Sequence, residues 1–284
     1  MLPATLLLLA AALPRAATAG AFESRTPYHA AGDAAARPGE AVLLAAWFHH
    51  SAGARKSVEH QTVRAEWRLD GVWKPLGEAR TDEGGKAVLA AKAPERPGPI
   101  PLRWWFKDQP AEATLWVVKE GQAVTIFDID GTLTPSDREN VKDYARRLLR
   151  RARAEGPKLR PHAVAAARRA AQDSLPVFIT GRPPFLGRPT REWLAFHGFP
   201  EGMVFLMPEG RDAWPTESRV GAAKLERLRD LQAKGLRILR VFGNATTDIS
   251  AYEGAGVAKA STFILGKHGG ERGTVALGEG FPAE

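Results

Sequence analysis

The chain of 284 residues contains no cysteine, which removes several kinds of chemistry at once. Disulfide bonds, thiolate zinc sites, a cysteine nucleophile and a lipid anchor on cysteine are all excluded. Any metal ion would therefore have to bind oxygen or imidazole ligands. The absence of cysteine carries no information about compartment, because many exported proteins have none.

Long apolar runs are also scarce. Residues 6–13 form an apolar stretch that is too short to cross a bilayer, and Ala17-Thr18-Ala19 follows as an A-x-A cleavage pattern. We predict that residues 1–19 are a cleaved signal peptide and that the protein is exported to the periplasm or the extracellular space. A misassigned start or an apolar tail is the alternative. No other stretch is predicted to span a membrane.

The positive charge is concentrated in one segment. The chain has a net charge of +8, and residues 138–169 contain eleven Lys or Arg against three Asp or Glu. This local excess equals the net charge of the whole chain. Such a segment favours anionic partners, namely acidic lipid head groups, polyphosphates or nucleic acid, although a solvated basic face would have the same composition.

Residues 41–118 alternate between apolar and polar side chains, which is typical of half-buried antiparallel strands. We predict that residues 22–119 form an all-β immunoglobulin-like sandwich with its tryptophans in the core. A sugar-binding aromatic face is the alternative. Six of the eight tryptophans lie in this part of the chain: Trp47, Trp67, Trp73, Trp104, Trp105 and Trp116.

Beyond residue 121 short apolar runs alternate with helical periodicity. This order predicts an α/β domain over residues 122–284, with a parallel sheet covered on both faces and ligands bound at the carboxyl ends of its strands. The expected strands are residues 123–129, 176–180, 203–207, 238–242 and 262–265. The expected helices are residues 139–154, 163–172, 190–197, 221–234 and 247–254.

Two carboxylates follow the first of these strands. Asp128 and Asp130 lie where the buried run enters the Gly131-Thr132 turn. Adjacent like charges are costly unless a cation or a shared proton offsets them, so the pair indicates a divalent metal. The turn offers backbone N–H groups to an anion, and the combination suits phosphoryl transfer through an aspartyl-phosphate. An ordinary strand-to-turn junction is the alternative.

Polar residues mark three later positions of the same domain. Thr180-Gly181 ends a strand and could bind a phosphate oxygen, and Lys224 could place a positive charge between phosphate and Asp128. Asn244 and Asp248 offer hard oxygen ligands to Mg²⁺. Each position alone has an ordinary explanation as a turn, a surface lysine or a helix cap. Their order along the chain favours a common site.

This order of motifs over residues 122–268 resembles the haloacid-dehalogenase superfamily of phosphatases with an aspartate nucleophile. The resemblance implies that Asp128 is the nucleophile, that Asp130 is the general acid and base, and that Lys224 stabilises the charged intermediate. It further implies a phosphate site formed by Gly131, Thr132, Thr180, Gly181 and Lys224. The implied Mg²⁺ ligands are Asp128, Asp130 through its backbone carbonyl, Asn244 and Asp248.

Two longer strings resemble a narrower branch. Residues 128–137 and 242–252 are similar both to lipin-type phosphatidate phosphatases and to the C-terminal domain of the RdgB/Nir phosphatidylinositol-transfer proteins. In the transfer proteins the nucleophile is typically lost and the domain senses lipid, so the presence of Asp128 and Asp130 favours an enzyme. The Ile-Thr-Gly-Arg-Pro string at residues 179–183 is closer to the transfer-protein version.

The substrate is expected to be a phospholipid. Fewer than fifty residues separate the Gly131-Thr132 turn from Thr180, too few for a large cap, and an open site can accept a head group from an anionic membrane surface. We expect a Mg²⁺-dependent phosphatase acting on phosphatidate or a related phospholipid, with nucleic acid not the expected partner. The alternatives are a non-catalytic phospholipid-sensing module and a phosphatase for soluble or nucleic-acid phosphomonoesters. Phe185, Leu186, Trp193 and Phe196 could form an apolar rim, or pack in the core.

Overall fold

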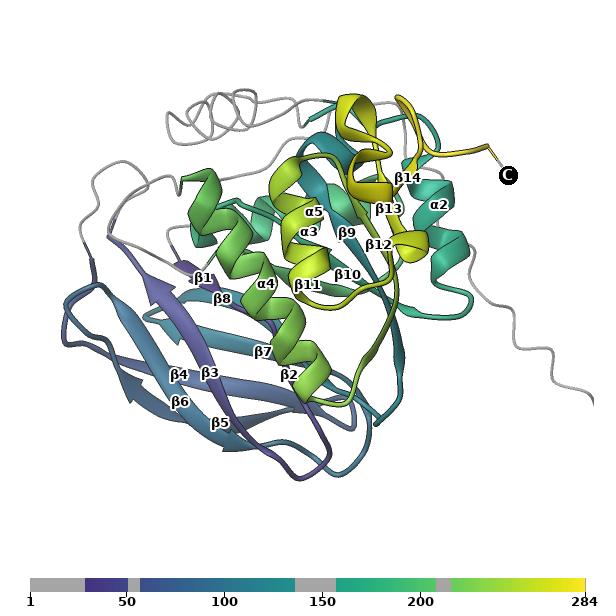
Figure 1. Ribbon diagram of the computed structural model, residues 1–284. Helices are drawn as coiled ribbons and strands as arrows, with labels where there is room; N and C mark the ends of the chain where they lie inside the picture. Colours follow the sequence, from purple (N-terminus) through teal and green to yellow (C-terminus); the bar gives the residue numbers. More distant parts are fainter. Residues whose placement is uncertain (1–28, 51–56, 136–156, 208–215, 284) are drawn as a thin grey trace, which may run out of the picture.

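The protein consists of an N-terminal pair of β-sheets packed against a C-terminal α/β unit (Figure 1). The computed structural model describes residues 29–50, 57–135, 157–207 and 216–283. The predicted signal peptide, the predicted helix over residues 139–154 and most of the basic segment lie outside the described residues.

The N-terminal strands form two sheets around one core. The first sheet has the order β1 (His29–Ala31), β3 (Ala41–Phe48), β6 (Lys86–Lys92). The second has the order β2 (Ala34–Ala36), β8 (Gln109–Val117), β7 (Gly98–Phe106), β4 (Thr62–Leu69), β5 (Val72–Arg80). All neighbours are antiparallel except β2 and β8. The predicted all-β sandwich is confirmed as two packed sheets, while its immunoglobulin-like identity stays a prediction.

The tryptophans do not fill this core as predicted. Trp104 is buried in it with 1% exposure and Trp67 packs only partly against it. Trp73 is half-buried outside this core, under the guanidinium of Arg103, whose carbon is 3.7 Å from the ring centroid. The prediction fails because the inner faces carry mainly alanine and valine, which bring the two sheets close and leave little space for indoles.

The C-terminal unit contains one parallel sheet with helices on both faces. Its strand order is β11 (Met203–Phe205), β10 (Leu175–Ile179), β9 (Ala123–Asp128), β12 (Arg237–Gly243), β13 (Thr262–Ile264), β14 (Val275–Ala276). The helices are α2 (Ala163–Ala170), α3 (Gly187–Phe196), α4 (Glu217–Ala233) and α5 (Thr246–Gly254). Short turns of helix cover Ile129–Leu133, Pro184–Leu186, Lys259–Ser261, Gly266–His268 and Glu271–Gly273. The predicted parallel α/β architecture is confirmed.

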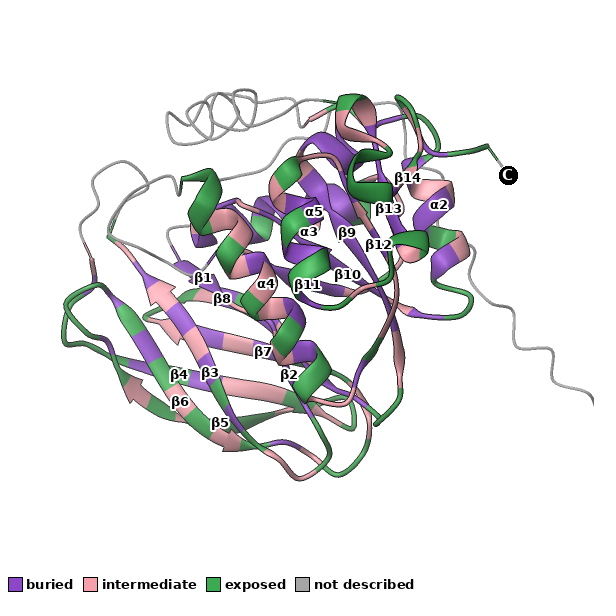
Figure 2. Ribbon diagram, in the orientation of Figure 1, coloured by how far each residue is buried: buried purple, intermediate pink, exposed green. Residues whose placement is uncertain are grey.

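The sheet separates two apolar cores, and strands β9 and β10 are buried along nearly their whole length (Figure 2). Helices α4 and α5 cover one face, and α2 and α3 cover the other. Leu186 and Trp193 are fully buried, so of the two alternatives given for them, rim and core, they pack in the core. Phe196 remains 36% exposed.

Helix α4 begins at Glu217, four residues before the predicted start. Thr216 accepts a hydrogen bond from the backbone N–H of Arg219 through its hydroxyl oxygen, at 3.4 Å, and so caps the helix. Because the first turn is polar and exposed, apolar periodicity alone does not detect it.

The two units share a polar and apolar interface. Trp116 of β8 belongs to the core formed mainly by the α/β unit. Asp33, whose side chain is fully buried, accepts hydrogen bonds from the backbone N–H of Thr114 at 2.7 Å and of Val204 at 2.9 Å. It also pairs with Arg191 Nη1 at 2.9 Å. One carboxylate therefore joins β8 of the sandwich to β11 and α3 of the α/β unit.

We expect Asp33→Ala to lower the free energy of unfolding by about 3 kcal/mol, because the variant leaves buried donors from both units without an acceptor. Urea denaturation of the full chain measures this loss. Glu95→Ala, which removes an exposed partner of Lys92, should change stability by less than about 0.5 kcal/mol. Equal losses in the two variants would contradict the role assigned to Asp33.

Candidate functional site

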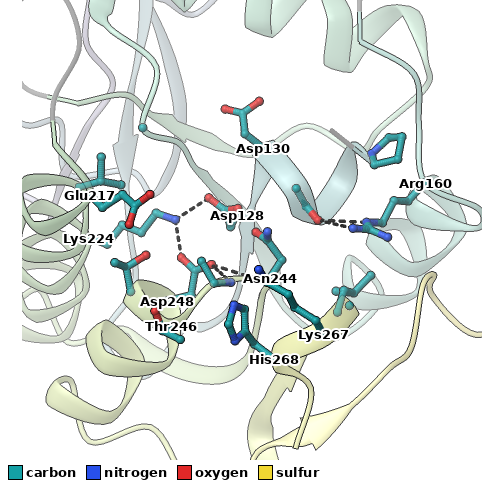
Figure 3. Close-up of a pocket in the computed structure, with 18 of the residues that line it drawn as sticks. Asp128, Asp130, Arg160, Glu217, Lys224, Asn244, Thr246, Asp248, Lys267 and His268 are labelled. Carbon is teal, nitrogen blue, oxygen red and sulfur yellow. Dashed lines mark hydrogen bonds and ion pairs between the residues drawn. The ribbon is translucent and has the colours of Figure 1, made fainter. Parts of the chain in front are cut away.

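A pocket of about 520 Å³ opens at the carboxyl ends of the parallel strands (Figure 3). Strand β9 contributes Asp128, β10 is followed by Gly181, and β12 is followed by Asn244. Helix α4 contributes Lys224 from the side. Asp128 and Asp248 are 120 residues apart in the sequence, yet both line this pocket. The pocket lies at the sheet edge where the sequence predicts the site.

Lys224 joins two carboxylates at the floor of this pocket. Its Nζ donates a hydrogen bond to Asp128 Oδ1 at 2.6 Å and another to Asp248 Oδ1. All three side chains are buried. Although burial disfavours the charged amine, attraction to Asp128 and Asp248 raises the pKa of Lys224 above its ordinary value. Lys224 is therefore a fixed positive charge beside Asp128.

Asp128 ends β9 and is 3% exposed. Burial raises the pKa of Asp128 to about 7, against the opposing attraction of Lys224 and with added repulsion from Asp248 and Asp130. The hydroxyl of Thr132 donates to Asp128 Oδ2 at 3.0 Å. The two oxygens of Asp128 therefore have different surroundings, with Lys224 at Oδ1 and the Thr132 turn at Oδ2.

Asp248 is engaged through both carboxylate oxygens. Oδ1 accepts from Lys224, and Oδ2 accepts from the backbone N–H groups of Asn244 and Ala245 at 3.0 Å each. In the structure Asp248 thus orients Lys224 and the start of α5. A direct bond from Asp248 to a metal stays a prediction.

The side-chain amide of Asn244 lies against the acid pair, and its orientation decides whether it donates hydrogen bonds there or offers an oxygen to a cation. One amide atom lies 3.1 Å from the backbone carbonyl oxygen of Asp130 and 3.3 Å from Asp128 Oδ2. If this atom is the amide nitrogen, it donates to both oxygens. If it is the amide oxygen, three oxygens converge and only a cation between them makes the arrangement favourable. Carboxylate, amide and carbonyl oxygens are ligands of the kind that Mg²⁺ accepts, with water completing the shell.

This donor set uses few ionisable side chains. Across the described ranges, no group of three or more His, Asp or Glu side chains could hold a metal ion. With the amide oxygen facing the acid pair, Asp128, Asn244 and the backbone carbonyl of Asp130 are the oxygen donors that the predicted Mg²⁺ would accept. Two of these three oxygens come from an amide and from the backbone.

Gly131 allows the close approach of Asn244. Its φ is +87°, and a Cβ at this position would lie 2.2 Å from Asn244 Nδ2. We expect Gly131→Ala to weaken Mg²⁺ binding at least about tenfold, because the methyl group displaces a ligand. Isothermal titration with Mg²⁺ measures this change. Gly121→Ala has a similarly positive φ of +73° but no atom within 4 Å of the added Cβ, so its Mg²⁺ affinity should be unchanged. Equal affinities in both variants would count against the ligand role of Asn244.

Asp130 turns its carboxylate away from Lys224 (Figure 3). Thr180 donates its hydroxyl hydrogen to Asp130 Oδ2 at 2.8 Å. Arg182 donates from Nη2 to Asp130 Oδ1 at 2.7 Å, and from Nε to both oxygens at 3.1 and 3.2 Å. The hydroxyl of Thr180 therefore contacts Asp130, and the predicted contact of Thr180 with phosphate stays a prediction. Gly181 lines the pocket at the expected place.

Arg182 is a site residue that the sequence reasoning missed. Its side chain is 1% exposed, and Nη1 donates to the hydroxyl of Thr190 on α3 at 2.9 Å. The only signal in the sequence is its place after Thr180-Gly181. A buried arginine that bridges a loop to a helix is not distinguishable there from a solvated one.

Arg160 is a second site residue that the sequence did not predict. Its Nε and Nη2 donate to the backbone carbonyl of Gly131 at 3.0 and 2.8 Å, and Nη1 donates to that of Glu279 at 2.6 Å. Arg160 therefore fixes the turn that follows Asp128. Lys267 and His268 also line the pocket, and His268 Nδ1 lies 2.7 Å from Glu271 Oε1. Composition places Arg160 only in the basic segment.

The raised pKa of Asp128 predicts how Mg²⁺ binding depends on pH. Because a proton and Mg²⁺ compete for the same carboxylate, we expect Mg²⁺ affinity to rise about tenfold per pH unit up to about pH 7 and to level off above it. Isothermal titration between about pH 5.5 and 8.5 tests this dependence. An affinity that does not change with pH would contradict it.

The raised pKa of Asp128 also predicts how the free energy of unfolding of the metal-free protein depends on pH. A carboxyl group whose pKa is raised on folding stabilises the folded state below its unfolded pKa, near 4, and this contribution is lost as the pH rises through about 7. The free energy of unfolding should therefore fall over that window. Asp128→Asn should reduce this fall, which urea denaturation at several pH values can show.

None of the helices that the structure describes is long and apolar enough to cross a membrane.

Residues 125–266 match the sequence model of a family described as the LNS2 domain of PITM 1–3. Human membrane-associated phosphatidylinositol transfer protein 1 is 30% identical over 206 residues, which cover 70% of this chain and 15% of that protein. The mouse membrane-associated phosphatidylinositol transfer protein 3 is 29% identical over 203 residues, with 69% and 19% coverage. The Drosophila melanogaster protein retinal degeneration B is 29% identical over 161 residues, with 56% and 11% coverage.

The chain thus spans less than a fifth of the length of these relatives. Among solved structures, the HAD domain of effector protein Lem4 from Legionella pneumophila is 13% identical, with a TM-score of 0.34 over 48% of this chain and 79% of that one. The resemblance to the transfer-protein branch is confirmed. Since residues 125–266 make up half of the chain, the protein belongs to the PITM 1–3 LNS2 domain family.

Proposed function

We propose that this LNS2 domain protein is a Mg²⁺-dependent phosphatase of the haloacid-dehalogenase type, acting on a phosphomonoester through an aspartyl-phosphate on Asp128. The observation that carries the proposal is the buried contact between Asp128 and Lys224 at the floor of an open pocket. A buried carboxylate at a pocket floor, with a lysine on one oxygen and a donor set for a hard cation on the other, suits attack on phosphorus. Asp130 lines the same pocket.

In the proposed reaction, an oxygen of Asp128 attacks the phosphorus atom and the bond from phosphorus to the substrate oxygen breaks. Asp130 gives a proton to the leaving alkoxide, and then takes a proton from the water that hydrolyses the aspartyl-phosphate. Lys224 stabilises the negative charge beside Asp128 throughout. Bound Mg²⁺, held by Asp128, Asn244 and the Asp130 carbonyl, would neutralise charge on the phosphoryl oxygens.

This reaction requires a movement of Asp130. Its carboxylate is held by Arg182 and Thr180, so it has to leave these partners to reach an oxygen atom of the substrate. Arg182 is thus a positioning residue for Asp130.

Phosphatidate or a related phospholipid is the proposed substrate class. Curated relatives are named as membrane-associated phosphatidylinositol transfer proteins, and the pocket is open to a head group. The basic segment over residues 138–169 would favour peripheral contact with an anionic membrane. We also propose that residues 1–19 direct export of the protein, and that the two-sheet sandwich is immunoglobulin-like, with β2 and β8 as its parallel pair.

A phosphate-release screen tests the proposal. Phosphatidate, lysophosphatidate, phosphatidylglycerol phosphate and p-nitrophenyl phosphate are offered with Mg²⁺ and with EDTA. We expect Mg²⁺-dependent release that is fastest with a phospholipid. Faster release from p-nitrophenyl phosphate than from any phospholipid would instead favour a phosphatase for soluble or nucleic-acid phosphomonoesters.

A non-catalytic lipid-sensing module is the second candidate function, and the contacts that hold Asp130 on Arg182 favour it. This candidate predicts binding to phosphatidate liposomes without release of phosphate. Flotation with liposomes, followed by a phosphate assay of the same sample, separates the two functions.

A further inference from the structure

The carboxylate of Asp33 holds two elements of the α/β unit against the sandwich. Asp33 lies in the segment that joins β1 to β2, and its side chain is fully buried. Oδ1 accepts a hydrogen bond within the sandwich, from the backbone N–H of Thr114 at 2.7 Å. Oδ2 accepts from the backbone N–H of Val204 on β11 and from Nη1 of Arg191 on α3, at 2.9 Å each. One oxygen is thus anchored in the sandwich, and the other binds β11 and α3 together.

Helix α3 also holds the side chain of Arg182. Thr190 precedes Arg191 on this helix, and its hydroxyl oxygen accepts a hydrogen bond from Arg182 Nη1 at 2.9 Å. The other two nitrogens of that guanidinium, Nε and Nη2, donate to the carboxylate of Asp130. Adjacent residues of α3 therefore contact Arg182 and Asp33.

Strand β11 and the residues after it hold the backbone of the same region. The carbonyl of Phe205, the residue after Val204, accepts from the backbone N–H of Thr180 at 3.0 Å. Met207 donates its backbone N–H to the carbonyl of Arg182, also at 3.0 Å. Thr180 and Arg182 are the two residues that donate to the carboxylate of the proposed general acid. We call them the acid-binding pair.

The position of Arg191 depends on Asp33. Its Nε and Nη2 are buried and have no hydrogen-bond partner among the residues that the structure describes. The guanidinium therefore relies on its ion pair with Asp33. Because a buried charge that loses its partner is strongly unfavourable, a change at Asp33 is expected to displace Arg191 and, with it, the neighbouring Thr190.

We propose that Asp33 of the sandwich is a positioning residue for Asp130, and that it acts through α3 and β11 on the acid-binding pair. The effect on turnover rests on the proposed function, in which Asp130 moves from this pair to the substrate. A displaced pair changes where that movement begins, and a misplaced acid slows proton transfer. The sandwich thereby has a role at the pocket without lending a residue to it. The effect on Arg182 itself does not depend on catalysis.

A spectroscopic test uses the full chain with ¹⁵N-labelled arginine. Loss of one signal in Arg182→Lys assigns the Arg182 Nε–H. We expect Asp33→Asn to shift this signal, because an amide has one oxygen in place of two and cannot accept from the donors of both units. An unchanged Arg182 signal in folded Asp33→Asn would overturn the proposal, whatever the activity of the protein.

Two further variants make this test independent of the stability of Asp33→Asn. Arg191→Met keeps Asp33 and its two backbone donors, and it should shift the same signal because the link to α3 is lost. Glu40→Gln is the control. Glu40 also joins the two units, but through Lys234 at the end of α4, at 2.7 Å, so the Arg182 signal should not change. An Arg182 signal that responds to Glu40→Gln as strongly as to Arg191→Met would also overturn the proposal.

Two phosphomonoesters separate a misplaced acid from a general loss of folded enzyme. p-Nitrophenol leaves readily as its anion, whereas the glyceryl oxygen of dioctanoyl phosphatidate needs a proton to leave. We expect Asp33→Asn to lower kcat/KM about tenfold for the phosphatidate and by less than about twofold for p-nitrophenyl phosphate. Glu40→Gln should change neither value by more than about twofold.

Equal losses of kcat/KM for the two substrates in Asp33→Asn would contradict the positioning role, since they indicate general damage. Absence of phosphate release from every substrate with the wild-type chain would instead refute the proposed function. The Arg182 signal still decides in that case whether Asp33 positions the acid-binding pair, so the two failures are distinguishable.

Discussion

Replacing Asp128 with Asn should abolish Mg²⁺-dependent phosphate release, with a loss of at least about 10³-fold in kcat. The amide keeps the shape of the carboxylate but cannot form the aspartyl-phosphate. It also removes one oxygen ligand of the predicted Mg²⁺. The fold should persist, because the variant replaces a buried carboxylate, whose pKa burial raises to about 7, with a neutral group. Phosphate release from the best substrate of the screen measures the loss, and circular dichroism checks the fold.

Asp173→Asn is the matched control for this variant. Asp173 follows α2 on the surface, where its carboxylate is 54% exposed and pairs with Arg240. Asp173→Asn should keep turnover within about twofold of the wild type, because Asp173 does not line the pocket. Unchanged turnover in Asp128→Asn, with a folded protein, would rule out the proposed nucleophile.

Replacing Lys224 with Met should reduce both turnover and stability. Without the ammonium group, the buried carboxylates of Asp128 and Asp248 lose their common partner. We expect phosphate release to fall at least about 10²-fold and the free energy of unfolding to fall by about 3–5 kcal/mol near pH 8. The loss of stability should be smaller near pH 5, where a carboxyl group with a pKa of about 7 binds a proton.

Arg229→Met removes a cation from the same helix and is the control. Its side chain donates to the carbonyl of Gly254 at an exposed position, so stability should change by less than about 1 kcal/mol and turnover should not change. Urea denaturation at the two pH values and the phosphate assay give both readouts. A Lys224→Met protein as stable as Arg229→Met would contradict the central place of Lys224 between the two carboxylates.

The strands of the α/β unit could be predicted because most of them are short apolar runs that follow a turn. The pattern over residues 123–129 and 176–180 predicts two buried strands of one parallel sheet, and the structure pairs β9 with β10 in parallel. The first residue of a helix is harder to predict from the sequence, as α4 shows, because a capping hydroxyl and a polar first turn have no apolar periodicity. The tryptophans were misassigned because hydrophobicity alone does not say which face of a strand meets which core.

The part of the candidate site that lies at the carboxyl ends of the strands could be predicted from the sequence. Asp128, Lys224 and Asn244 meet because parallel strands bring their carboxyl ends to one edge. Arg182 could not be assigned in the same way, because its contact with Asp130 depends on the direction in which two side chains leave adjacent strands. The contact between Arg160 and Gly131 depends on the path of the chain between them, for which the sequence offers no periodic signal.

The most direct test of the central claim is to locate the phosphoryl group during turnover. The full chain is mixed with Mg²⁺ and the best substrate of the screen, quenched in acid, and digested for peptide mass spectrometry. The account predicts a phosphorylated carboxylate at Asp128 that is lost on treatment with hydroxylamine. Turnover without a phosphorylated Asp128, or with the phosphoryl group on another residue, would contradict it.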